Sequence, residues 1–80
     1  MIALGLGFNR IGDISSIVKA FPSLRVLDIG YNHLTSLDDL IENLKKLKHL
    51  EHLTIEGNPC TLLLSYKRRV SKALPRLRSL

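Results

Sequence analysis

Three short segments of the chain share one pattern of apolar and polar positions. Residues 4–11, 27–34 and 53–60 each read L-x-[LI]-x-x-N-x-[ILC], and their asparagines, Asn9, Asn32 and Asn58, follow one another at intervals of 23 and 26 residues. Residues 74–80 match 21–27 and 47–53 register for register, so a fourth copy begins there. Alternation places both leading apolar side chains on one face of a short strand. The pattern therefore predicts repeated strands that pair as a parallel sheet, with their apolar residues in columns.

The asparagine of each segment falls where the chain turns away from the predicted sheet. Its side-chain amide donates and accepts hydrogen bonds at once, so it can satisfy backbone groups that are buried at the turn. We expect the three asparagines to form a hydrogen-bonded ladder between copies. Small residues near the same corner ease tight backbone geometry; they are Gly7, Gly30 and Gly57.

The segments between the predicted strands have helical spacing. Asp13 and Ser36 precede apolar runs as capping residues, and Asp39 makes a variant of the capping box with Ser36. Ser65 opens a third helix, and Pro75 follows its end. The side chains expected to face inward are Ile14, Ile17, Val18 and Phe21, then Leu37, Leu40, Ile41, Leu44 and Leu47, then Tyr66, Val70, Ala73 and Leu74. The predicted fold class is α/β, built as strand, turn and helix three times over.

Composition supports a thin aliphatic core and an intracellular protein. The chain has 80 residues, no Trp, two Phe and two Tyr, and a domain of this size buries only about 60% of the surface of its unfolded chain. No apolar run approaches the roughly 18 residues of a membrane span, and the first residues do not resemble a secretory leader. Cys60 is the only cysteine, which predicts a buried, reduced thiol. We expect a cytoplasmic location, with the nucleus or cilium as alternatives.

These motifs resemble the leucine-rich repeat family, in particular the subclass typified by the regulatory subunit of protein phosphatase 1. Residues 9–17 and 32–40 fit its N-x-I-x-x-I-x-x-L pattern, with isoleucine or leucine at each apolar position. The third copy resembles the C-terminal cap of that group: Gly57-Asn58-Pro59, then Tyr66-Lys67, then residues 74–80 as L-P-x-L-x-x-L. The cap motif normally continues with Asp after this last leucine, where the chain ends. Similar modules occur in spliceosomal, axonemal, nuclear-export and histone-binding proteins, so the resemblance is specific for fold and weak for function.

The resemblance implies a right-handed solenoid with the parallel sheet on the concave side and the helices on the convex side. We expect residues 1–80 to form a single domain, with repeats at about 1–23, 24–49 and 50–76 and a fourth or cap strand at 77–80. Because Met1 falls inside a repeat, we expect the chain to be part of a longer protein with more repeats before Leu4.

In such a stack, residues between the apolar strand positions point into the concavity and are available to a partner. The first hypothesis is a non-catalytic scaffold that binds a helix or loop of a partner protein. The residues expected to carry it are Phe8, Asp28, Tyr31, His52, Thr54 and Glu56. Phe8 and Tyr31 occupy one column, and two interpretations remain open: the rings pack on each other to cover the corner, or they form an exposed aromatic contact.

A basic stretch near the C-terminus gives the second hypothesis. Net charge is +5, and residues 65–80 hold six basic side chains and no acidic one: Lys67, Arg68, Arg69, Lys72, Arg76 and Arg78. They form either a solvated helix face or a patch for nucleic acid, anionic lipid or an acidic protein segment. A third possibility is purely structural, in which the segment extends a larger solenoid of a ciliary or nuclear assembly and the active surface lies elsewhere.

Residue patterns typical of metal sites and of enzymes are weak. His49 and His52 are three apart at the entry to a strand, where that spacing points them to opposite faces. Asp38, Asp39 and Glu42 fall at the start of a helix, where negative charge favours the helix dipole. Nothing resembles a nucleophile elbow, a catalytic triad or a dinucleotide-binding glycine motif. We therefore expect no enzyme activity, no metal, no cofactor and no small-molecule substrate.

Overall fold

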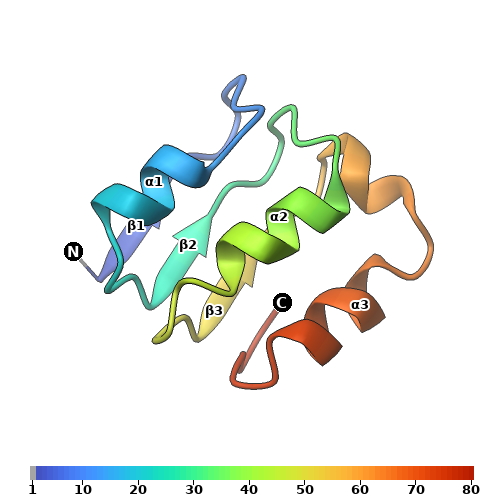
Figure 1. Ribbon diagram of the computed structural model, residues 1–80. Helices are drawn as coiled ribbons and strands as arrows, with labels where there is room; N and C mark the ends of the chain where they lie inside the picture. Colours follow the sequence, from blue (N-terminus) through green and yellow to red (C-terminus); the bar gives the residue numbers. More distant parts are fainter. Residues whose placement is uncertain (1) are drawn as a thin grey trace.

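The computed structural model describes residues 2–80 and has three successive strand-to-helix units (Figure 1). The strands are β1 (Ala3–Gly5), β2 (Val26–Asp28) and β3 (His52–Thr54), and the α-helices are α1 (Ser15–Ala20), α2 (Leu37–Leu44) and α3 (Tyr66–Ala73). A short 3-10 helix, η1 (Pro59–Leu62), precedes α3 and was not predicted. None of the helices in the described part of the chain is long and apolar enough to cross a membrane.

The three strands form one parallel sheet in the order β1-β2-β3. Leu4 pairs with Leu27, and Leu27 pairs with Leu53, so the predicted apolar column is confirmed. Past β3, residues 77–80 contribute a single parallel bridge between His52 and Ser79, and the Leu53 N–H donates to the Ser79 carbonyl over 3.2 Å. The alternation of the sequence excludes a slip of one residue, because such a slip would turn the leucines outward.

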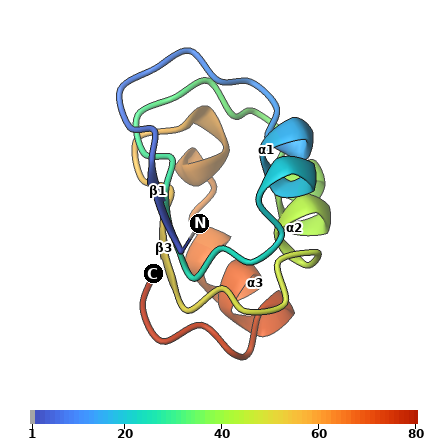
Figure 2. The same ribbon diagram turned by 90° about the vertical axis from the view of Figure 1, so that its left-hand side faces the viewer.

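All three α-helices lie on the same side of the sheet, as the edge-on view in Figure 2 shows. The opposite side, called the open face below, consists of the residues between the apolar strand positions: Ala3, Gly5, Val26, Asp28, His52 and Thr54. All of these are exposed, whereas the central residues of β2 and β3 are buried under the helices. The sheet therefore has one core-facing side and one side that is accessible to a partner.

The core between sheet and helices is aliphatic, as the composition predicted. Leu27, Ile29, Leu53 and Ile55 from the strand segments meet the inward residues of α2 and Val70 of α3. The matching residues of the first unit, Leu4, Leu6 and Ile11, are only half-buried, because within residues 2–80 no further unit covers β1. The Cys60 thiol is buried as expected, and desolvation raises its pKa.

Asn32 and Asn58 are the buried polar residues of the described chain, only 3% and 2% exposed. Asn58 Nδ2 donates to the Ile29 and Ile55 carbonyls, and its Oδ1 accepts from the N–H groups of Asn32 and Leu34, all within 3.1 Å. Asn32 repeats this arrangement one unit earlier, where its Oδ1 accepts from the Ile11 N–H and its Nδ2 donates to the Leu6 carbonyl. The predicted ladder is therefore confirmed for Asn32 and Asn58, whereas Asn9 is exposed and donates only to the Leu6 and Gly7 carbonyls of its own unit.

The predicted capping residue is confirmed at the start of α2, whereas the starts of α1 and α3 differ from the prediction. Ser36 Oγ accepts from the Asp39 N–H at the start of α2, as predicted. Asp13 instead accepts from the hydroxyl and N–H of Ser15, which lowers its pKa, and α1 begins only at Ser15. Ser65 lies at the N-cap of α3 but its side chain makes no capping hydrogen bond there. Leu47 is buried as expected, although α2 has already ended at Leu44.

Candidate functional site

The residues predicted to contact a partner lie on the open face and at the corner where the strands end. Asp28 of β2 pairs with Thr54 of β3. His52 lies two residues earlier on β3 and pairs with Val26 of β2. The His52 ring shares a hydrogen bond of 2.7 Å between Nδ1 and Ser79 Oγ. Glu56 is exposed just past β3, and its carbonyl accepts from the Tyr31 N–H over 2.8 Å. The sheet thus holds these side chains in one fixed array.

The Asp28 carboxylate is held at the C-terminal end of β2. Its Oδ1 accepts a hydrogen bond of 3.0 Å from the Gly30 N–H. A Cβ atom at Gly7 would lie 3.7 Å from both carboxylate oxygens, so this carboxylate also lies beside the corner of the first unit. Because Gly5 and Gly7 carry no side chains, the carboxylate stays accessible from the open face.

Phe8 and Tyr31 stack in parallel, with ring centroids 4.6 Å apart and planes within 3°. The rings pack on each other, as the first interpretation expected, and they also remain accessible, because Phe8 is 81% and Tyr31 48% exposed. We call Phe8, Tyr31 and Gly57 the aromatic corner. Sequence reasoning treated packing and exposure as alternatives, whereas the structure combines them.

The aromatic corner has an unusual backbone. Phe8 and Tyr31 have φ values of 59° and 55°, and Gly57, at the same place in the third unit, has 79°. A side chain in this left-handed region costs about 1–3 kcal/mol, and an aromatic pair returns about 0.5–1.5 kcal/mol in addition to the area that it buries. Positions with this backbone favour glycine or asparagine, and here two of the three carry aromatic side chains.

Gly57 is needed because the Tyr31 ring lies against its backbone. A Cβ atom built on Gly57 would collide with the Cδ1, Cε1 and Cγ atoms of that ring. Tyr31 is consequently enclosed between Phe8 on one side and Gly57 on the other, while the outer face of Phe8 stays uncovered. The Phe8–Tyr31 stack is therefore covered by Gly57 on the Tyr31 side and exposed on the Phe8 side.

An open hollow of about 530 Å³ adjoins the aromatic corner. It is lined by Tyr31, Asn32, His33, Gly57, Asn58, Pro59, Thr61 and Leu62. Leu62, Leu63 and Leu64 are exposed next to it, and sequence reasoning missed them. The available sign was three successive leucines that fit neither the strand alternation nor the spacing of a helix.

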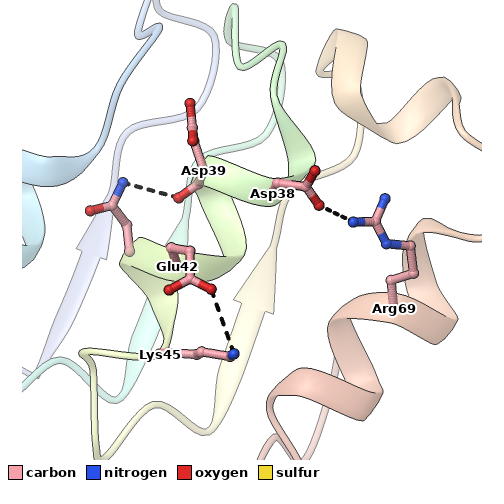
Figure 3. A network of polar contacts seen from close by, with 6 residues as sticks. Asp38, Asp39, Glu42, Lys45 and Arg69 are labelled. Carbon is pink, nitrogen blue, oxygen red and sulfur yellow. Dashed lines mark hydrogen bonds and ion pairs between the residues drawn. The ribbon is translucent and has the colours of Figure 1, made fainter.

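The six predicted basic residues do not form one free surface. Arg69 is half-buried and pairs with Asp38 of α2 (Figure 3), so its charge is partly neutralised by a neighbouring unit. Arg76 donates to the Lys48 carbonyl over 3.3 Å, and Arg78 lies 3.5 Å from the Glu51 carboxylate. Lys67, Arg68 and Lys72 are exposed. The helix face therefore keeps three of the six charges, and the other three contact neighbouring units.

A second group of basic residues lies near the N-terminal ends of the strands. We call Arg25, Lys48, Arg76 and Arg78 the basic edge. Arg25, Lys48, Arg76 and Arg78 line a pocket of about 270 Å³ together with His49, Leu50 and Glu51. Glu51 also lies 3.8 Å from Arg25, so one carboxylate faces two guanidinium groups. Sequence reasoning did not find this pocket, because Arg25 and Lys48 come from units far from residues 76–78 in the chain.

The acidic residues at the start of α2 have structural contacts, as expected. Asp38 pairs with Arg69, and Glu42 lies 3.6 Å from Lys45 (Figure 3). The Asp39 N–H donates to Ser36 Oγ. His33, His49 and His52 are exposed. Within residues 2–80, no group of three histidine, cysteine, aspartate or glutamate side chains converges as metal ligands would.

A family profile described as leucine-rich repeats in two copies matches residues 2–42. The chain belongs to the leucine-rich repeat family. Human leucine-rich repeat-containing protein 43 is 38% identical over 68 residues, which span 80% of this chain and 10% of that protein. An acidic leucine-rich nuclear phosphoprotein 32-related protein of Plasmodium falciparum is 36% identical over 78% of this chain and 22% of its own. Bovine tubulin-specific chaperone E is 40% identical over 66% of this chain and 10% of its own.

A solved structure is also similar to this chain. The structure of Chaetomium Mex67:Mtr2 subunits contains a chain that superposes with a TM-score of 0.82 and 32% identity, over 100% of this chain and 56% of that one. The present chain therefore spans about a tenth of the length of the first curated relatives and about half of this structural neighbour. Leucine-rich repeat proteins generally mediate protein–protein interaction.

The Tyr31–Gly57 contact gives a direct stability prediction. Gly57→Ala places a methyl group in the Tyr31 ring at a positive φ, so we expect a loss of about 2 kcal/mol in the free energy of unfolding. Gly5→Ala is the matched control, because nothing lies within 4 Å of its Cβ position, and it should stay within about 0.5 kcal/mol of the native value. Urea unfolding monitored by circular dichroism measures both, and equal effects of the two variants would contradict the assigned contact.

Proposed function

We propose that this chain is a non-catalytic interaction segment that binds a partner protein through the open face and the aromatic corner. The observation that carries the proposal is the division of the sheet: the helices cover one side, and the other side presents exposed side chains in fixed register. Asp28, His52, Thr54 and Glu56 supply hydrogen-bonding groups there, and the aromatic corner supplies apolar area. Rigid elements that display such side chains bind without ordering a loop, which lowers the entropic cost of association.

The proposal extends to the longer architecture. We infer a right-handed solenoid of the protein-phosphatase-1-regulatory-subunit-like subclass with its sheet on the concave side, repeats at about 1–23, 24–49 and 50–76, and a cap strand at 77–80. Half-burial of Leu4, Leu6 and Ile11 supports further repeats against β1, because their counterparts in the second unit are fully buried. The single buried thiol of Cys60 supports an intracellular setting for this protein.

A cross-linking experiment tests the open face directly. We expect a photoreactive amino acid at Thr54 of the full-length protein to capture a partner protein in its native cells. The same amino acid at Lys46, which is exposed just after α2, should not capture it. The partner so identified should bind the Asp28→Asn/Tyr31→Ala double variant at least about tenfold more weakly, as expected for hot-spot residues. The asparagine keeps an oxygen for the Gly30 N–H, so the fold should remain intact.

Two results would contradict this proposal. The first is unchanged affinity of the double variant for the captured partner. The second is capture from Lys46 and not from Thr54, which would favour the structural alternative, with the active surface elsewhere in a larger assembly. Circular dichroism of each variant separates a loss of contact from a loss of fold.

The basic edge supports a second candidate function, the binding of nucleic acid or another polyanion. The supporting observation is the pocket lined by Arg25, Lys48, Arg76 and Arg78, in which the carboxylate of Glu51 faces only Arg25 and Arg78. Binding of this kind weakens with added salt, because phosphate contacts release bound counterions.

The two basic features predict different mutational results with a duplex DNA probe. Arg76→Ala/Arg78→Ala should lower the slope of log affinity against log salt by about 2, because two phosphate contacts are lost. Lys67→Ala/Arg68→Ala, on the exposed face of α3, should lower the slope less if the basic edge is the binding site. Absence of DNA binding at physiological salt in a mobility assay would remove this candidate.

A further inference from the structure

We propose that the aromatic corner, together with the carboxylates of Asp28 and Glu56, is a seat for an arginine side chain of the partner protein. This inference rests on the proposed function and adds the chemistry of the partner. It draws on three observations: an exposed aromatic face, adjacent negative charge and a neighbouring apolar hollow.

The first observation is the accessible ring face at Phe8. The two rings are parallel, and Tyr31 is covered on its far side by Gly57, so the column presents one flat aromatic surface outward. Planar guanidinium groups stack on such faces, with both the ring quadrupole and the flat contact contributing.

The second observation is the position of the carboxylates. Asp28 lies beside Gly7 and Gly30, which directly precede Phe8 and Tyr31 in the chain. Its Oδ1 accepts one N–H, and a carboxylate offers about four acceptor sites, so capacity remains for a guanidinium fork. Glu56 directly precedes Gly57, on which the Tyr31 ring rests. Negative charge therefore flanks the aromatic corner on the open face.

The third observation is the charge at the two ends of the strands. The basic edge lies at the N-terminal end of the strands, with Arg25 just before β2 and Arg78 after α3. Asp28 and Glu56 lie at the C-terminal end of the strands, beside the aromatic corner. This distribution favours a cation from the partner at the corner and disfavours an acidic one. The adjoining hollow, with Pro59 and Leu62 in its lining, offers apolar contact for aliphatic residues beside that arginine.

A titration with capped peptides tests the seat. We would follow backbone amide chemical shifts of the 80-residue chain as acetyl-Gly-Arg-Gly-amide is added, and compare lysine and citrulline peptides of the same form. The arginine peptide should cause saturable shifts at the amides of Gly7, Gly30 and Gly57. Its affinity should exceed that of the lysine peptide at least about threefold, and the neutral citrulline peptide should not saturate.

Variants separate the two parts of the seat. Phe8→Leu removes the ring but keeps an apolar side chain, and Asp28→Asn removes the charge but keeps an oxygen for the Gly30 N–H. Each should lower affinity for the arginine peptide at least about threefold. Asp39→Asn, an exposed carboxylate on α2, is the matched control and should leave affinity unchanged.

Three outcomes would overturn this inference: equal saturation by the citrulline peptide, no saturable shift at the corner, or shifts centred on Glu51. Arg10 follows Phe8 on an exposed loop, so the titration is repeated with Arg10→Gln. Binding found only in that variant would mean that the chain's own guanidinium fills the seat, and would also overturn the inference. A failed titration with intact cross-linking from Thr54 would leave the proposed function standing, which keeps the two claims separable.

Discussion

The Asn58 side-chain amide is the interaction on which the arrangement of the units depends. It joins carbonyls of two neighbouring strand ends, Ile29 and Ile55, and it receives the N–H groups of Asn32 and Leu34 across the boundary between units. These backbone groups are buried where the chain leaves the sheet, so water cannot satisfy them. Asn32 makes equivalent hydrogen bonds one unit earlier. Leucine packing alone allows small slides between units, whereas these directional bonds specify one register.

The same constraint produces the surface that we assign to binding. To bring an asparagine amide under the preceding carbonyls, the residue before it takes a left-handed backbone in all three units, as Phe8, Tyr31 and Gly57 do. The Phe8 and Tyr31 side chains then project away from the core and meet in a stack. The same register places the Asp28 carboxylate beside Gly7 and Gly30, which precede Phe8 and Tyr31. The buried hydrogen bonds and the exposed recognition surface therefore depend on the same geometry.

Sequence reasoning predicted what depends on local periodicity and failed where distant units meet. The pairing of Leu27 with Leu53, the asparagine ladder and the Ser36 cap all follow from spacing and side-chain chemistry. The pairing of Arg69 with Asp38, and the convergence of Arg25 with Arg78, depend on how helices and loops of different units approach one another. The exposed Leu62 and Leu64 have no periodic partner, and positive φ at Phe8 and Tyr31 contradicts the preferences of aromatic residues. The predicted binding residues do lie together, but sequence alone gave no order of importance among them.

The free energy of unfolding of Asn58→Ala, measured beside that of Asn9→Ala, tests the central claim most directly. Asn9 is exposed and donates only to the nearby carbonyls of Leu6 and Gly7, so its loss should cost about 1 kcal/mol or less. Asn58→Ala removes four buried hydrogen bonds and leaves the Ile55 carbonyl and the N–H groups of Asn32 and Leu34 without their partner, whereas the Ile29 carbonyl keeps its bond from Asn32. We expect a loss of at least about 3 kcal/mol in urea unfolding. Similar small losses for both variants would contradict the account, because the register would then be held by aliphatic packing and not by the asparagine amides.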